Sequence, residues 1–376
     1  MSHIVVIGAG FGGLTAIREL RKRDAKVEIT LVAPQAEFLY LPSLIWIPSG
    51  LREPGDLKIN LEAFLKRHRV NFHRGRVTGL REGGRVVVTD AGEVRNDGLI
   101  IASGGRFMKK LPGIEHSIAI CEGVDAAMRI RDRLRDMSGG TIALGFAGNP
   151  LEPSAMRGGP IFELLFCLRT QLKREKRLKN FKFVFFSPAP RPGERLGPKA
   201  VDSLLRRMHH FGVETHLGAK ILHFAPGKIL TERAEIAADL ILFMPGMTGP
   251  DWAEASGLTL TPSGHFKADE MARVEGAERV YAVGDGAAFP GPQWQAKQAH
   301  AADLQAVAAA ENLLHELKGV EPTRAFKHEI ICIVDTLDKG MLVFRDEKRA
   351  LALPPSFLGH WAKRIFEKRY LAKLAS

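Results

Sequence analysis

A glycine-rich segment near the start of the sequence constrains the fold more than any other feature. Residues 8–13 fit the spacing G-x-G-x-x-G and lie between an apolar run at 3–7 and a helix-like run at 14–23. This context predicts a strand, a tight turn, a helix and a second strand over 27–32. In such a unit the glycines permit the turn, let the backbone approach a pyrophosphate, and let the helix pack on the strand. The exposed N–H groups at the start of the helix favour phosphate. We therefore expect dinucleotide contacts from Gly8, Gly10, Phe11, Gly12 and Gly13.

A second unit of the same kind begins near residue 141. A strand over 141–146, a helix over 160–176 and a strand over 181–186 repeat the β-α-β order, which predicts another parallel sheet. Segments 71–79 and 85–89 are typical of short strands in a meander. The predicted fold class is α/β, with two Rossmann-like dinucleotide-binding domains and a C-terminal region made of strands and an amphipathic helix.

The length and charge of the chain limit what it can do. Its 376 residues suit two domains of roughly 100–200 residues each. Lys and Arg number 54 against 42 Asp and Glu, which gives a formal charge of +12 and favours an anionic partner. That partner could be an acidic membrane surface, a phosphate-bearing cofactor or a small anion. We expect no nucleic-acid partner, because no module of that kind is visible.

Three cysteines are too few and too scattered for a metal site or a disulfide framework. Cys121, Cys167 and Cys332 form no C-x-x-C pair, so we expect no structural zinc. Any thiol chemistry must bring together residues that are distant in the sequence.

The segment Val-Tyr-Ala-Val-Gly-Asp-Gly-Ala at 280–287 is the second cofactor motif, and an alanine-rich helix follows it. An aspartate at this strand end, Asp285, can bind the ribityl chain of a flavin, and the predicted cofactor is therefore FAD. The acid that usually holds the ribose after the second strand is absent, since Ala-Pro-Gln stands at 33–35. Glu37 or backbone groups must replace it. The remaining predicted FAD contacts are Ser103, Gly104, Gly284 and Lys297.

With these motifs the chain resembles the two-dinucleotide-fold flavoproteins of the disulfide reductase superfamily. It resembles most closely the sulfide:quinone oxidoreductases and their relatives, flavocytochrome c sulfide dehydrogenase and the type II NADH:quinone oxidoreductases. The resemblance runs from His3 to Lys373. Four features favour the sulfide branch: Cys121 after residues 117–120, the segment 332–340, Lys297, and the tail segment 360–368.

The resemblance implies an FAD enzyme that takes electrons from sulfide or a related sulfur donor and passes them to a membrane quinone. It implies that Cys332 is a redox cysteine, which reacts as a thiolate where positive groups lower its pKa. It also implies that Lys297 places positive charge at the flavin pyrimidine edge and stabilises the reduced flavin.

The chain departs from the family at the second redox cysteine, whose position is held by Arg157. Cys167 lies ten residues further on, about 15 Å along a helix, whereas a disulfide needs Cα atoms within about 7 Å. We therefore expect Cys167 to be a buried, hydrophobe-like residue. Arg157 is predicted to be catalytic, across the flavin from Cys332, where it holds an anionic donor. The alternative is that it pairs with a carboxylate such as Glu163 and braces the helix start.

The second dinucleotide motif is degraded. Gly-Phe-Ala-Gly-Asn-Pro at 145–150 replaces a clean fingerprint, Pro153 follows it, and no acid ends the next strand at 185–188. This pattern argues against NADH as the electron donor.

The tail predicts a membrane-seeking helix. Phe357, Leu358, Trp361 and Ile365 form an apolar stripe, and a basic helix with Trp on its stripe suits a membrane interface. A dimer or domain contact is the alternative, and a homo-oligomer remains open. No stretch reaches the ~18 apolar residues of a membrane span, and no signal peptide is visible, so we expect a peripheral protein on the cytoplasmic side. The basic residues around the stripe are Lys363, Arg364, Lys368, Arg369 and Lys373.

These observations predict four regions along the chain: the first part of an FAD-binding domain at 1–110, a degenerate NAD-type domain at 111–238, the second part of the FAD domain at 239–318, and a redox-cysteine and membrane-association region at 319–376. The preferred function is a sulfide:quinone oxidoreductase-like enzyme. The alternatives are a type II NADH:quinone oxidoreductase-like flavoprotein, a reductase of another small donor, and a flavin-bearing binding or sensor protein.

Overall fold

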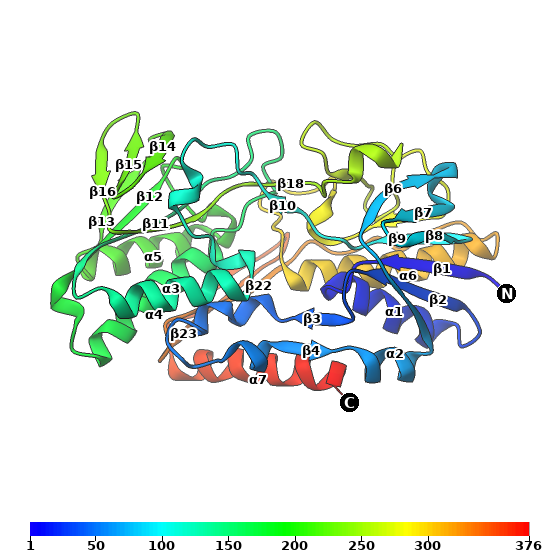
Figure 1. Ribbon diagram of the computed structural model, residues 1–376, viewed down its shortest axis with the longest axis horizontal. Helices are drawn as coiled ribbons and strands as arrows, with labels where there is room; N and C mark the ends of the chain where they lie inside the picture. Colours follow the sequence, from blue (N-terminus) through cyan, green and yellow to red (C-terminus); the bar gives the residue numbers. More distant parts are fainter. Residues whose placement is uncertain (376) are drawn as a thin grey trace.

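The glycine loop follows the central strand of a five-stranded parallel sheet, which forms one half of the molecule in the computed structural model (Figure 1). The structure describes residues 1–375. The strand order is β20-β9-β1-β2-β5. Both faces of β1 are covered, as its run of apolar residues requires. The elements are β1 (His3–Ile7), α1 (Phe11–Arg23), β2 (Glu28–Ala33), β5 (Val70–Arg74), β9 (Gly98–Ile101), β20 (Val280–Ala282) and α6 (Ala299–Leu317).

The predicted strand over 71–79 is corrected by the structure, which divides it between two sheets. Its first part, β5, pairs in parallel with β2, and only its second part, β6, belongs to the meander. The chain changes sheets at Gly75, where a Cβ would lie 2.8 Å from Thr89 Oγ1. The meander consists of β6 (Val77–Arg81), β7 (Val86–Thr89) and β8 (Gly92–Arg95).

The other half is built on a four-stranded parallel sheet of order β13-β12-β11-β17. Here β17 pairs with β11, so residues 240–244 belong to this sheet. We had expected them in the second part of the FAD-binding domain, at 239–318. Short flanking sheets join the two halves or cover them. The elements of this half are α3 (Val124–Asp136), β11 (Gly140–Phe146), α4 (Gly159–Arg174), β12 (Phe181–Ser187), α5 (Pro198–His210), β13 (Glu214–Leu217), β14 (Ile221–Ala225), β15 (Lys228–Thr231), β16 (Glu235–Ala237) and β17 (Leu240–Met244).

The C-terminal region consists of one antiparallel sheet and one helix. The strands around Cys332 form a three-stranded sheet, β22-β23-β24. Helix α7 starts against β23. The two backbones are so close there that a Cβ on Gly359 would lie 2.1 Å from the Gly340 carbonyl oxygen. From there α7 runs along one edge of the molecule, past β4, towards α2 (Figure 1). The elements are β22 (Ile330–Asp335), β23 (Gly340–Arg345), β24 (Ala350–Ala352) and α7 (Phe357–Ala375).

Short elements complete the fold. A bridge between Ile118 and Leu242 adds the segment before Cys121 to the edge of the second sheet, which places Cys121 near the carboxyl ends of its strands. The short elements are β3 (Glu37–Leu39), η1 (Leu41–Trp46), η2 (Pro54–Leu57), β4 (Lys58–Asn60), α2 (Glu62–His68), β10 (Arg106–Phe107), η5 (Ile120–Glu122), η7 (Glu194–Leu196), β18 (Met247–Thr248), β19 (Phe266–Lys267), η9 (Gly284–Gly286) and β21 (Ala287–Ala288).

Candidate functional site

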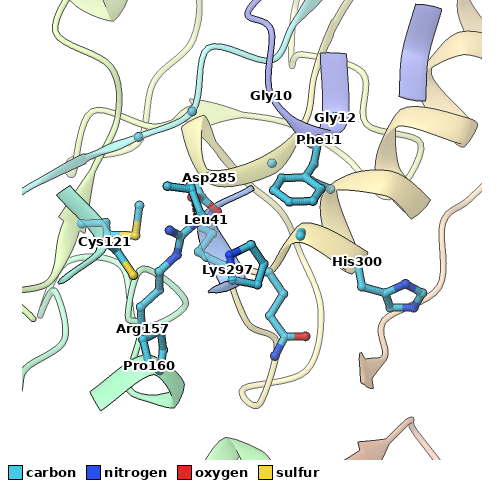
Figure 2. Close-up of a pocket in the computed structure, with 18 of the residues that line it drawn as sticks. Gly10, Phe11, Gly12, Leu41, Cys121, Arg157, Pro160, Asp285, Lys297 and His300 are labelled. Carbon is cyan, nitrogen blue, oxygen red and sulfur yellow. Dashed lines mark hydrogen bonds and ion pairs between the residues drawn. The ribbon is translucent and has the colours of Figure 1, made fainter. Parts of the chain in front are cut away.

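One cavity of about 1090 Å³ collects residues from both halves of the molecule and from the C-terminal region. It exceeds the roughly 300–1,000 Å³ that is usual for small-molecule pockets. Its wall includes the glycine loop, the end of β9, the start of α4, the strand β22 and one side of α7. Figure 2 shows part of this wall, with the loop residues Gly10, Phe11 and Gly12 on one side and Cys121 and Arg157 on the other.

The glycines of the loop have separate roles. Gly10 precedes α1 and lines the cavity, and a Cβ there would meet no atom within 4 Å, so the backbone is open to a pyrophosphate. Gly8 has a φ of +103° and lies against Ala102, which explains the turn. Gly13 does not line the cavity, contrary to its prediction as a cofactor contact. A Cβ there would lie 1.9 Å from the Gly8 oxygen, so Gly13 serves the packing of helix on strand.

The other predicted FAD contacts lie along the same cavity. Ser103, Gly104, Gly284 and Asp285 line its wall, as do Gly8, Phe11 and Gly12. Glu37, which we expected to replace the missing acid, lines the wall and pairs with Lys58 at 3.4 Å. The wall therefore offers an N-terminal helix end for phosphates and a long path towards the cysteines, which fits FAD.

Arg157 lies between Cys121 and Asp285 (Figure 2). Its guanidinium forms an ion pair with Asp285, and both side chains are about 15% exposed. Burial raises the pKa of the Cys121 thiol, and the neighbouring Arg157 opposes that rise. We had expected Arg157 to lie across the flavin from Cys332, or else to pair with a carboxylate such as Glu163. Arg157 does pair with a carboxylate, but the partner is Asp285 rather than Glu163, and the neighbouring thiol is Cys121. Its role towards an anionic donor stays a prediction.

Lys297 is a buried lysine in the cavity wall, with 8% exposure. Its ammonium group donates to the Ala287 carbonyl. Burial lowers its pKa to about 8, and Asp285 opposes this effect. A lysine buried in this way keeps its charge poorly until an anionic or carbonyl group of a ligand joins it.

The three cysteines have different environments. Cys332 on β22 is half-buried and lines the cavity. Burial raises its pKa to about 12, Glu163 adds to the rise and Lys363 opposes it. Cys167 is buried as expected, at 1% exposure, away from the cavity wall and with its Sγ 3.6 Å from the Asp335 carbonyl oxygen.

A buried ion pair between Glu163 and Lys363 is the main part of the site that sequence reasoning missed. Both residues line the cavity, and their side chains are 8% and 10% exposed. Burial raises the pKa of Glu163 while Lys363 lowers it. These two residues come from α4 and α7, 200 positions apart, and no local pattern signals such a pair.

Helix α7 turns its apolar side outward. Lys363, which we expected beside the apolar stripe, is buried in the structure, together with His360 and Glu367. The stripe itself is exposed: Phe357 is 63% and Trp361 53% accessible. Phe366 is 57% exposed and also lines the cavity, so the cavity reaches the surface at this face. The exposed apolar residues of this region are Leu351, Leu353, Phe357, Leu358, Trp361, Ile365 and Phe366.

Two general properties of the described chain complete the picture. Within residues 1–375, no helix is long and apolar enough to cross a membrane. Over the same residues, no cluster of three or more His, Cys, Asp or Glu side chains could hold a metal ion.

Comparison with known proteins supports the fold and the cofactor. The sequence model of the family described as pyridine nucleotide-disulphide oxidoreductase matches residues 2–306. The chain is 23% identical to a sulfide-quinone reductase of Aquifex aeolicus, over 99% of this chain and 91% of that protein. It is 25% identical to the type II NADH:quinone oxidoreductase Ndh of Mycobacterium tuberculosis, over 99% and 84% respectively.

The structural comparison confirms the predicted architecture. The crystal structure of the sulfide:quinone oxidoreductase from Aquifex aeolicus matches with a TM-score of 0.90 at 22% identity, and the match covers 100% of this chain and 92% of that one. The overall fold of the chain is therefore that of this protein. The chain belongs to the pyridine nucleotide-disulphide oxidoreductase family and is an FAD-dependent oxidoreductase that resembles the sulfide-quinone and type II NADH:quinone reductases.

Proposed function

We propose that this enzyme oxidises sulfide, or a related small sulfur donor, and passes the electrons through FAD to a membrane quinone. One observation carries the proposal: a single cavity combines the dinucleotide loop, two cysteines and a mouth at the exposed apolar face of α7. When bound, FAD supplies the two-electron acceptor between donor and quinone. The chain's own residues bind the donor, exclude water and move protons.

On the donor side, Cys332 and Cys121 are the thiols that can take up sulfur. A thiol and hydrogen sulfide lose two electrons and two protons as they form a persulfide, and sulfide or another thiol in solution then removes the outer sulfur. Because Arg157 lies beside Cys121, we assign it to the anionic donor or the leaving sulfur, through charge-assisted hydrogen bonds. With an arginine in place of a third cavity cysteine, sulfur cannot be stored as a bridge between that position and another thiol.

On the acceptor side, the quinone enters from the membrane. Ile331 and Phe366 line the cavity and are 38% and 57% exposed, so an apolar tail can remain in lipid while the headgroup lies inside. Glu163 and Lys363 line the same wall and can protonate the reduced headgroup. Basic residues around the apolar face favour an anionic bilayer, and the proposed location is therefore a peripheral one on such a surface.

A type II NADH:quinone oxidoreductase is the second candidate, since two relatives bear that name. The degraded second loop speaks against it. Asn149 in this loop donates to the Met247 carbonyl, and Gly148 lies against Gly246. The loop therefore packs against the segment that follows β17. Pro150 and Pro153 follow in the sequence where a phosphate-binding helix would begin.

One anaerobic titration decides between the candidates. The purified yellow protein is mixed with sulfide or with NADH while the flavin absorbance is followed, and a short-chain quinone is then added. We expect rapid bleaching by sulfide, slow or no bleaching by NADH, and recovery of the absorbance with quinone. Bleaching by NADH within milliseconds would promote the second candidate, and a flavin that no donor reduces would indicate a binding or sensor protein.

A further inference from the structure

A second polar cluster lies behind the cavity wall, around Asp335 at the end of β22. The Asp335 carboxylate is fully buried. One oxygen accepts from Trp46 Nε1 at 2.9 Å and from the Leu337 N–H at 2.8 Å, while the other lies 2.7 Å from His360 Nδ1 on α7. A buried carboxylate with three partners of this kind is held in a single position.

This cluster is continuous with the ion pair in the cavity wall. The Asp335 backbone N–H donates to Glu163 Oε1 at 2.9 Å, and the same oxygen receives the Lys363 ammonium. Lys363 also interacts electrostatically with Asp335. The far end of the cluster is His360, whose side chain keeps 9% exposure while that of Asp335 has none.

A third carboxylate completes what we call the Asp335 cluster: Glu163, Asp335, His360, Lys363, Glu367 and Arg52. Glu367 Oε1 pairs with Arg52 Nε at 2.6 Å, and its other oxygen accepts from Ser43. All three carboxylates are at least nine-tenths buried.

The charges of the Asp335 cluster do not balance without a proton. Three carboxylates face two cations that are charged at neutral pH, Lys363 and Arg52, which leaves one negative charge. An uncompensated charge in a protein interior is costly, so the cluster favours one additional proton. The ring of His360, 2.7 Å from the Asp335 carboxylate, is the member of the cluster placed to hold this proton.

The surroundings of His360 contain few other charges. It is faced by Asp335 from β22, by the uncharged Trp46 from η1 at a ring distance of 5.8 Å, and by Gly340 from β23. From α4, Glu163 acts through Asp335, and the exposed Arg174 reaches the Leu337 carbonyl at 3.4 Å. Lys363 and Arg364 are the charged neighbours on α7 itself.

We propose that proton uptake by the His360–Asp335 pair restores the charge of the Asp335 cluster each time the Glu163–Lys363 pair gives up a proton during turnover, with His360 as the proton inlet from the α7 side. This inference rests on the proposed quinone reduction. A quinone takes up two electrons, from the donor through FAD, and two protons to become a quinol. Each proton that Glu163–Lys363 gives to the headgroup leaves the cluster more negative, and a proton taken up at His360 from solvent restores its charge. His360 and Asp335 are thus positioning residues that act through Glu163 and Lys363.

The kinetic test compares His360→Asn with His209→Asn, a control at an exposed histidine of α5. Flavin-loaded protein is reduced with dithionite, which bypasses the sulfur donor, and mixed anaerobically with decylubiquinone over about pH 6 to 9. We expect flavin reoxidation to be at least about tenfold slower in His360→Asn, with a flattened pH profile and partial recovery when imidazole is added. The control should match the wild type.

The outcomes distinguish a failure of the proposed function from a failure of the proton inlet. If quinone fails to reoxidise even the wild-type flavin, the proposed function is wrong. If the wild type is reoxidised and His360→Asn has the same rate and pH profile, the inlet is wrong. A slower variant with an unchanged pH profile and no imidazole rescue indicates a merely structural role and also overturns the proposal.

A second readout does not depend on turnover. Ring ¹⁵N signals of His360, assigned by their loss in His360→Asn, are recorded at one fixed pH in the wild type and in Glu163→Gln. Removing a buried carboxylate removes the charge that a protonated ring balances, so the signals should move towards those of a neutral imidazole. Unchanged signals would show that His360 and Glu163 are not coupled, contrary to the proposal.

Discussion

At the scale of single residues, the loop glycines differ in whether their missing side chain faces ligand or protein. Gly10 is open to the cavity, whereas Gly13 is in contact with Gly8. The same substitution should therefore have different consequences at the two positions, although the motif treats both glycines alike.

Gly10→Val should fold normally and purify without flavin, because its side chain fills the space of the pyrophosphate while its Cβ meets no protein atom within 4 Å. Gly13→Val should instead destabilise the fold, since even a Cβ would lie 1.9 Å from the Gly8 oxygen and overpacking costs about 1–3 kcal/mol or more. Flavin absorbance and thermal unfolding of both variants measure the difference. Full flavin occupancy in Gly10→Val would contradict the assignment of this loop.

A substitution at Arg157 tests whether its positive charge favours the thiolate of Cys121. Its replacement by Met keeps an apolar stem, removes the cation beside Cys121 and breaks the ion pair with Asp285. Both effects disfavour the Cys121 thiolate. We expect Cys121 to react with iodoacetamide about tenfold more slowly at a fixed pH, which corresponds to about one pKa unit. Mass spectrometry resolves the three cysteines, and buried Cys167 serves as an unreactive reference. Arg191→Met, at a surface loop position, is the control. An unchanged rate at Cys121 would mean that Arg157 only braces Asp285.

At the scale of elements, α7 is amphipathic in a way that its sequence does not announce. The basic residues suggest that charge surrounds the apolar stripe on all sides, yet the side that packs on the protein carries His360, Lys363 and Glu367. Those groups are buried because Asp335, Glu163 and Arg52 meet them there. The apolar side faces away from the protein, and insertion into a lipid bilayer would remove it from water.

Trp361→Ser combined with Ile365→Ser should therefore weaken binding to phosphatidylglycerol vesicles and leave thermal stability nearly unchanged, since both side chains are about half exposed. The loss should reach about tenfold or more, because burial of a large apolar side chain is worth roughly 1.5–3 kcal/mol. Added salt should weaken the remaining binding. Leu222→Ser, at an exposed leucine of β14, is the matched control. Equal vesicle binding by the double variant and the wild type would exclude this face as the membrane anchor.

At the scale of the whole molecule, what could be predicted from the sequence follows the range of each interaction. The β-α-β unit is local, because its turn, helix start and strand spacing lie within about thirty residues, and the structure has it where expected. The ion-pair partners of Arg157, Glu163 and Lys363 are 128 to 200 residues away, so the sequence indicates their presence but not their pairing. Strand β17 was placed in the wrong sheet for the same reason: a buried apolar strand does not indicate which sheet it joins.

The wall of the cavity runs from Ile7 to Tyr370, and this span has a consequence for how the enzyme is made. The five-stranded sheet lacks β20 until residue 282 has been synthesised. Helix α7, which forms one side of the cavity, is synthesised later still. A growing chain on the ribosome therefore has a glycine loop but no enclosed place for the flavin. We therefore expect FAD to be captured after synthesis has passed residue 370, so that maturation depends on the free flavin available at that moment.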